Sequence, residues 1–81
     1  MLQELKTAKK VVGIKQLRKA LREGTATRVY VAEDADPHLT APILDACAAG
    51  DIPVVRIPTM AELGTACAIE VGAAVAAIVR Q

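Results

Sequence analysis

A short strand gives way to a helix in the stretch Gly13-Ile-Lys-Gln-Leu-Arg-Lys19. The two residues before it, Val11 and Val12, are consecutive and β-branched, as is typical of a strand. From Ile14 onward the apolar residues recur at helical spacing, in a stripe made of Ile14, Leu17, Ala20 and Leu21. The sequence therefore predicts a brief strand over residues 11–12 and a helix over about 14–23, with Gly24 as its C-terminal cap.

The opposite face of this helix carries four cations, Lys15, Arg18, Lys19 and Arg22, with Gln16 at its edge. At ~100° per residue these cations span an arc of about 100°. They form like-charge pairs four residues apart, each destabilising by a few tenths of a kcal/mol. The helix macrodipole also disfavours a cation near the N-terminus, at Lys15. An anionic partner would remove both penalties, so the face is either a solvated surface or an anion-binding site.

The rest of the chain alternates helical and strand patterns. Helices are expected over residues 2–9, 37–49 and about 60–66, and strands over 28–33, 53–57 and 73–79. Asp36 is a natural N-cap before Pro37, and Thr59 with Glu62 forms a capping box. The last strand is apolar on both faces, which favours the centre of a covered sheet. The alternation predicts an α/β fold, a three-layer α/β/α sandwich with four strands, whose order the pattern does not fix.

Composition limits the classes of function. The 81 residues suffice for one small domain, and Tyr30 is the single aromatic residue, so stacking of RNA bases on aromatic rings is essentially excluded. The net charge is only +1, but residues 1–28 carry +6 and residues 29–81 carry −5. Cys47 and Cys67 are expected to be buried, reduced thiols. No signal region or membrane-length apolar run is present, which favours a cytoplasmic protein.

An enzyme is the alternative suggested by the acidic residues at 33–36. Glu33, Asp34 and Asp36 follow a predicted strand, where α/β proteins often place active sites, and three carboxylates could bind Mg²⁺. No nucleophile–base pair or glycine-rich phosphate loop accompanies them, and His38 is interpreted as an exposed residue at a helix start. We therefore expect no catalytic residues, no metal site and no cofactor.

Four segments in order resemble the kink-turn-binding ribosomal protein family, which includes the archaeal seven-Ae proteins and eukaryotic relatives. They are Gly13-x-Lys-Gln-x-x-Lys19, Val31-Ala-Glu-Asp-Ala-Asp-Pro37, Ile57-Pro-Thr59 with Glu62-Leu-Gly-x-Ala-Cys67, and Ile69-Glu-Val-Gly-Ala-Ala74. The Lys15-Gln16 pair, where archaeal and eukaryotic members usually have Asn-Glu, resembles the small bacterial YbxF-type branch. Each segment alone is weak evidence for the family, but four segments in the right order are specific to it.

The resemblance implies a mixed sheet of strand order 1-4-2-3 with the last strand antiparallel to the others. It also implies a single RNA-binding domain over residues 1–81 that binds kink-turns, which are duplexes sharply bent at a bulge beside sheared G·A pairs. The implied groove-reading residues are Lys15, Gln16 and Lys19, and Gly13 of the same motif is also expected to belong to the RNA-binding site. Ile69, Glu70 and Val71 would pack on extruded nucleotides, and Asp36 would help to hold the flipped base. Arg18 and Arg22 are expected either to attract RNA phosphates or simply to keep the protein soluble.

Departures from the family pattern bear on affinity. Ile14 and Leu17 stand where relatives commonly carry Thr, and Met60 stands where several have Lys, so binding is expected to be weaker. We expect a monomer that binds structured RNA (ribosomal RNA, a riboswitch or another RNA) and neither DNA nor membranes. A separate alternative is a ribosome-associated protein-interaction module whose basic face is only a general anchor on ribosomal RNA.

Overall fold

The computed structural model describes residues 9–69 and 71–80. Its elements in chain order are β1 (Lys10–Val12), α2 (Ile14–Glu23), β2 (Ala26–Ala32), α3 (Pro37–Ala49), β3 (Val54–Ile57), α4 (Met60–Ala66) and β4 (Val75–Val79). The helix predicted over residues 2–9 lies, apart from Lys9, outside the described residues.

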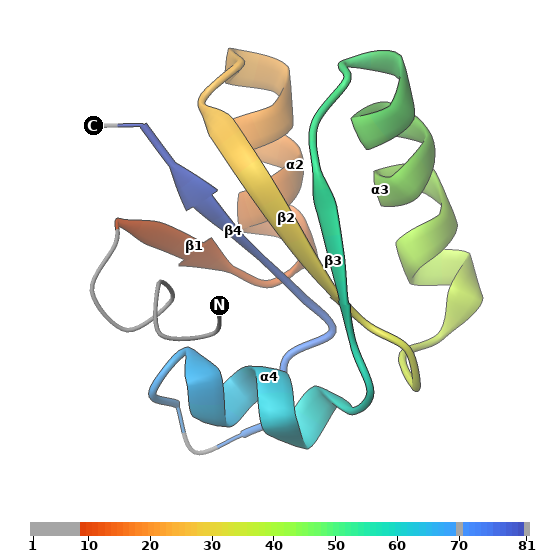
Figure 1. Ribbon diagram of the computed structural model, residues 1–81, viewed down its shortest axis with the longest axis vertical. Helices are drawn as coiled ribbons and strands as arrows, with labels where there is room; N and C mark the ends of the chain where they lie inside the picture. Colours follow the sequence, from red (N-terminus) through yellow and green to blue (C-terminus); the bar gives the residue numbers. More distant parts are fainter. Residues whose placement is uncertain (1–8, 70, 81) are drawn as a thin grey trace.

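The four strands form one mixed sheet in the order β1-β4-β2-β3 (Figure 1). β4 is antiparallel to both β1 and β2, whereas β2 and β3 are parallel. β4 therefore occupies the sheet interior, as its continuous apolar sequence requires. The predicted strand order and the predicted direction of the last strand are both confirmed.

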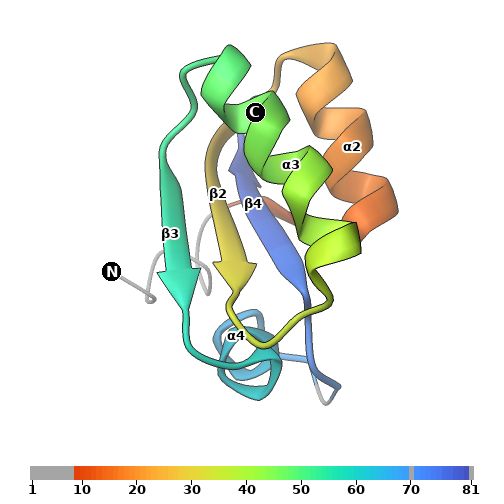
Figure 2. The same ribbon diagram turned by 90° about the vertical axis from the view of Figure 1, so that its right-hand side faces the viewer.

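Helices cover the sheet on both faces, which gives the predicted three layers. Side chains alternate along β2, so Val29 and Val31 pack with α2 and α3. Tyr30 and Ala32 point the other way and pack with Leu63 and other residues of α4. α2 and α3 lie side by side on one face, and α4 lies toward one end of the sheet (Figure 2). Tyr30 is fully buried, so the one aromatic ring is in the core.

The helix ends follow the sequence signals. Gly24 adopts a left-handed conformation (φ 71°) and its N–H donates to carbonyls of the last turn of α2. Asp36 Oδ1 accepts from His38 N–H at 2.9 Å, which caps α3. Thr59 Oγ1 accepts from Glu62 N–H at 3.1 Å, one of the two bonds of a capping box.

Two strands differ from the prediction by two residues at their starts. β2 begins at Ala26 rather than Arg28, because Ala26 already pairs with Val79 across a register irregularity. β4 begins at Val75 rather than Ala73, because the Ala73 N–H donates to Met60 C=O of α4 instead of to a strand. The apolar run thus includes a segment that attaches to a helix.

Both cysteines are free and buried, as predicted. Burial raises the pKa of each thiol, and the charge of Lys10 partly opposes that rise in the pKa of Cys67. Within residues 9–69 and 71–80, none of the helices has the length and apolar character needed to cross a bilayer.

Candidate nucleic-acid interface

One end of the sheet gathers most of the residues that the sequence singled out. Because β4 runs against the other strands, its amino end lies beside the carboxyl ends of β1, β2 and β3. The start of α2, the acidic turn at residues 33–36, α4 and the loop before β4 are therefore neighbours (Figure 1). We call residues 67–74 the α4–β4 loop.

Gly13 fixes the start of α2 at this end. Its N–H donates to Val75 C=O at 3.0 Å, and its own carbonyl accepts from Leu17 N–H at 3.0 Å. Its φ of 99° lies in a region that residues with a Cβ rarely adopt. Glycine here allows the chain to leave β1 and start α2 next to the α4–β4 loop.

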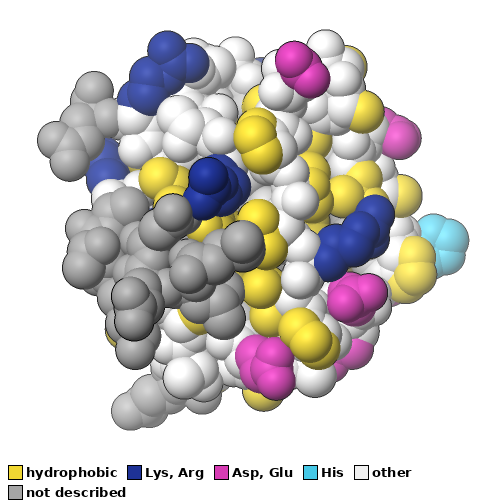
Figure 3. Space-filling model, viewed as in Figure 1, with side chains coloured by type: hydrophobic (Ala, Val, Ile, Leu, Met, Phe, Trp, Pro, Cys, Tyr) yellow, Lys and Arg dark blue, Asp and Glu magenta, His cyan; other side chains and the backbone are white. Residues whose placement is uncertain are grey.

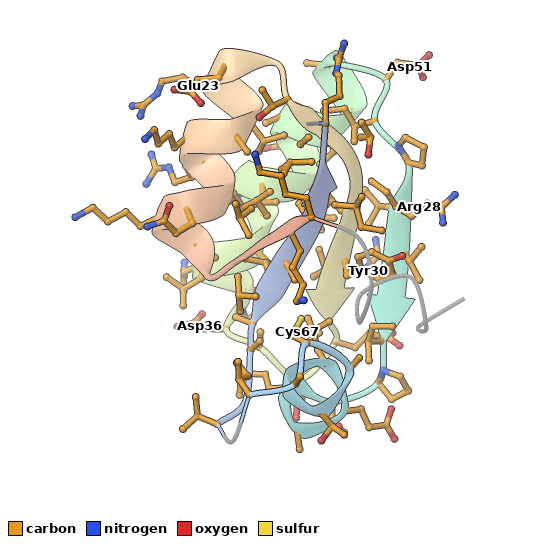
Figure 4. All side chains as sticks on the ribbon, turned by 90° about the vertical axis from the view of Figure 1, so that its left-hand side faces the viewer. Glu23, Arg28, Tyr30, Asp36, Asp51 and Cys67 are labelled. Atoms are coloured by element: carbon orange, nitrogen blue, oxygen red, sulfur yellow. The ribbon has the colours of Figure 1, made fainter. Side chains whose placement is uncertain are left out.

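α2 has the two faces that its sequence predicts. Leu17 and Ala20 are buried against the sheet. The side chains on the opposite side are all exposed, namely Lys15, Gln16, Arg18, Lys19 and Arg22. The cations thus form an accessible ridge. Figure 4 shows Lys and Arg side chains projecting from α2 away from the sheet, whereas Figure 3 shows the other face of the sheet, where basic and acidic side chains both reach the surface.

Grooves run along both sides of this ridge. The first, here called the α2–α3 groove, is lined by Arg18 and Arg22 from α2 and by Pro42, Ile43 and Ala46 from α3, with Leu21. The second, here called the β1–α2 groove, has polar lining from Lys9, Gln16, Lys19, Glu23 and Arg80. The ridge side chains are therefore divided, with Lys19 and the neutral Gln16 on one side of α2 and Arg18 and Arg22 on the other.

The α4–β4 loop is attached to α4 at both of its ends. Ile69 N–H donates to Gly64 C=O, and Ala73 N–H donates to Met60 C=O, both at 3.0 Å. Ile69 is half-buried and packs against the core below, whereas the Val71 side chain is 71% exposed. Glu70, predicted to belong to the same surface, lies outside the described residues. The Val71 side chain is thus exposed between two residues of the loop, Ile69 and Ala73, that are hydrogen-bonded to α4.

Gly64 belongs to one of the family-like segments, but the sequence analysis assigned it no role. A Cβ atom at Gly64 would collide with the carbonyl oxygen of Val71, so only glycine allows the loop to lie this close to α4. At Gly72, in the α4–β4 loop, a Cβ would lie 3.1 Å from Met60 Cβ. The available signal for Gly64 was a glycine within a predicted helix, where it costs about 1 kcal/mol relative to Ala and so requires a reason.

The acidic turn has structural roles. Asp36 caps α3, and Asp34 Oδ1 accepts from Met60 N–H, the first residue of α4, at 2.8 Å. Glu33 and His38 are exposed. Within the described ranges, His, Cys, Asp and Glu form no group of three or more that could hold a metal ion. Figure 4 shows Asp36 at the end of the molecule where α2 begins, with Glu23 at the end where α2 stops.

Replacing Asp34 with Ala is expected to lower the free energy of unfolding by about 1 kcal/mol, because the first N–H of α4 loses its acceptor. Thermal or urea unfolding measures the effect. Glu33→Ala is the matched control, since it removes the adjacent exposed carboxylate of the same turn. Equal stability of the two variants would contradict the structural role of Asp34.

Comparison with known proteins identifies the family of the chain. The model of the ribosomal protein L7Ae/L30e/S12e/Gadd45 family matches residues 1–81. The chain belongs to this family. Among family relatives, an RNA-binding protein of Geobacillus sp. strain WCH70 is 47% identical over 76 residues, covering 94% of this chain and 93% of the relative. The RNA-binding protein YbxF of Geobacillus stearothermophilus is 46% identical over the same coverage, which agrees with the predicted YbxF-type likeness.

Solved structures show the same fold. The Giardia lamblia 15.5kD RNA binding protein superposes with a TM-score of 0.88 at 30% identity, over 99% of this chain and 71% of that protein. A Bacillus halodurans protein of unknown function gives a TM-score of 0.87 at 28% identity, over 98% and 83% of the two chains. The fold of this chain is thus shared with solved proteins from Bacillus halodurans and Giardia lamblia.

Proposed function

We propose that this chain is a non-catalytic, cytoplasmic RNA-binding protein, acting as a single domain and a monomer, that recognises kink-turns and stabilises the kinked conformer. The observation that carries the proposal is the hydrogen bond from Gly13 N–H to Val75 C=O, which joins the basic start of α2 to the first residue of β4, directly after the α4–β4 loop. A cationic helix end and an apolar loop therefore face a ligand together. Family membership and the RNA-binding relatives support the same class of partner.

The geometry suits a kinked duplex better than a regular one. The major groove of A-form RNA is too deep and narrow for side chains to read its base edges. A sharp kink opens this groove, so the first turns of α2 can enter it. Lys15 and Lys19 then donate to guanine O6 and N7, while Gln16 offers both donors and acceptors to a base edge.

The other residues act around this contact. Arg18 and Arg22 neutralise phosphates. Val71 packs on an extruded nucleotide together with Ile69 and Glu70, the other members of the predicted contact segment. Asp36 uses one oxygen for the cap of α3, and a carboxylate has acceptor capacity left to bond a flipped base. Because only the kinked conformer presents the open groove, binding selects that conformer and shifts the RNA population toward it.

The test compares a kink-turn with the same RNA whose sheared G·A pairs are changed to Watson–Crick pairs, titrated at fixed salt. The change restores the closed A-form groove, so we expect at least a tenfold loss of affinity, or about 1.4 kcal/mol. A FRET-labelled kink-turn should bend on addition of protein without Mg²⁺.

The salt dependence separates this specific term from a general one. If about three to five cations neutralise phosphates, log K should fall with log salt at a slope of roughly −3 to −4 for either RNA. Equal affinity for both RNAs with no change in FRET would contradict kink recognition. That result would leave a general basic anchor on RNA, as expected of a ribosome-associated interaction module.

A further inference from the structure

The β1–α2 groove is a second basic surface. Two of its cations, Lys9 and Arg80, have no role in the proposed contact between α2 and the RNA bases. It has a volume of about 210 Å³ and contains three cations, Lys9, Lys19 and Arg80, against one carboxylate, Glu23. These cations come from different parts of the chain. Lys19 projects from α2, whereas Lys9 precedes β1 and Arg80 follows β4. The positive charges therefore stand on both walls of the groove.

Backbone pairing holds the two outer cations in place. Val79 N–H donates to Lys9 C=O at 3.0 Å, so the antiparallel pairing of β1 with β4 continues to Lys9 and brings it beside Arg80. Arg80 N–H donates to Thr25 C=O at 2.9 Å, and its guanidinium Nη2 donates to Gly24 C=O at 2.7 Å. The Arg80 charge is thus fixed over the C-terminal end of α2, where the helix dipole favours a cation.

We propose that the β1–α2 groove binds phosphates of the RNA strand that continues past the kink toward the C-terminal end of α2. This inference rests on the proposed function, because the groove shares Gln16 and Lys19 with the base-reading face. From Gln16 to Gly24 the helix advances about 12 Å, which corresponds to a few base pairs of the bound stem. Lys9 on the β1 side and Arg80 over the end of α2 bracket a phosphate there.

The α2–α3 groove is less suited to the same role. Its cations, Arg18 and Arg22, both belong to α2, and α3 contributes Pro42, Ile43 and Ala46 to the other wall. A phosphate in that groove would contact charge from one side and apolar surface from the other. The β1–α2 groove offers charge from two sides, which favours it for a polyanionic strand.

The test uses the double variant Lys9→Ala with Arg80→Gln, in which glutamine keeps an N–H donor toward Gly24 C=O. On a kink-turn with a long stem we expect at least a tenfold loss of affinity and a salt slope less steep by about 1 for each cation removed. On a kink-turn whose stem is cut back to the base pairs beside the first turns of α2, the double variant should bind like the unsubstituted protein. Arg56→Ala, an exposed cation on β3 at the other edge of the sheet, removes the same charge as Lys9→Ala and should change neither quantity.

Glu23→Gln supplies a change of opposite sign. Removing the carboxylate of the groove should strengthen long-stem binding several-fold, which a purely structural role of the groove would not produce. Thermal melting checks that each variant folds. If Arg80→Gln lowers the melting temperature, the single variant Lys9→Ala, at an exposed residue, replaces the double variant in the test. If Lys9→Ala left the long-stem affinity and the salt slope unchanged, phosphate binding in the β1–α2 groove would be contradicted. This conclusion would hold even if the G·A test confirmed kink recognition. Failure of the G·A test would overturn kink recognition instead, and the stem-length effect would then be measured on the Watson–Crick duplex.

Discussion

Replacing Lys19 with Ala is expected to weaken kink-turn binding by about 1–3 kcal/mol, because an exposed ammonium that donates to a guanine edge is lost. Lys15→Ala should act similarly. Arg22→Ala should have a smaller effect and should weaken all RNAs alike, since its contact is with phosphate. Titration of a fluorescent kink-turn and of its Watson–Crick counterpart measures both effects.

Unfolding of the free protein controls this prediction. Lys15 and Lys19 form a like-charge pair four residues apart on α2, so removing either charge should leave the fold intact and raise helix stability by a few tenths of a kcal/mol. Weaker binding with unchanged or higher stability therefore identifies a contact to RNA. If Arg22→Ala were the most damaging variant and Lys19→Ala had no effect, the assignment of the reading face would be wrong.

Gly64→Ala should reverse the usual effect of that substitution. Inside a helix, Ala is normally more stable than Gly by about 1 kcal/mol. Here the added Cβ would meet the Val71 carbonyl, so we expect a loss of about 1–3 kcal/mol in the free energy of unfolding, together with weaker RNA binding. Urea unfolding and RNA titration measure the two effects.

Two further variants separate the position of the loop from its contact with RNA. Thr65→Ala changes the next, exposed residue of α4 and should alter stability by no more than about 0.5 kcal/mol. Val71→Asp should leave stability unchanged but abolish binding, because the new carboxylate repels the RNA backbone. A more stable Gly64→Ala protein with normal affinity would show that the loop does not need its close approach to α4.

Patterns among neighbouring residues in the sequence were sufficient to predict most of the helices and strands and the caps of the helices. The spacing of Leu17 and Ala20, the caps at Gly24 and Asp36 and the apolar run before Val79 each depend on residues near one another in the chain, and the structure agrees with them. The strand order is different, because it depends on pairing between distant segments. It came from the resemblance to a family, since alternation of helices and strands fits several orders.

The candidate site also has some features that local sequence patterns predict and others that depend on contacts between distant residues. The exposed face of α2 follows from helical periodicity, so the cations could be identified from sequence. The clearance at Gly64 and the bond from Met60 N–H to Asp34 join residues that are close only after folding. The pattern at 33–36 instead suggested an enzyme, because an acidic turn after a strand has the same sequence whether its carboxylates bind a metal or a backbone N–H.

The central position of β4 has a consequence for the order in which the chain becomes functional. Lys10 pairs with Ile78 and Val29 pairs with Ala77, so β1 and β2 are both held by a strand that the ribosome makes long after them. Such distant pairing makes the search for the native sheet slow relative to a helical protein of this size. The earlier segments lack their pairing partner and expose apolar surface until Val75–Val79 has left the ribosome. α2 is made early, but it acquires its neighbour at Val75 only in this last step, so a nascent chain cannot engage RNA through the complete surface before its sheet has closed.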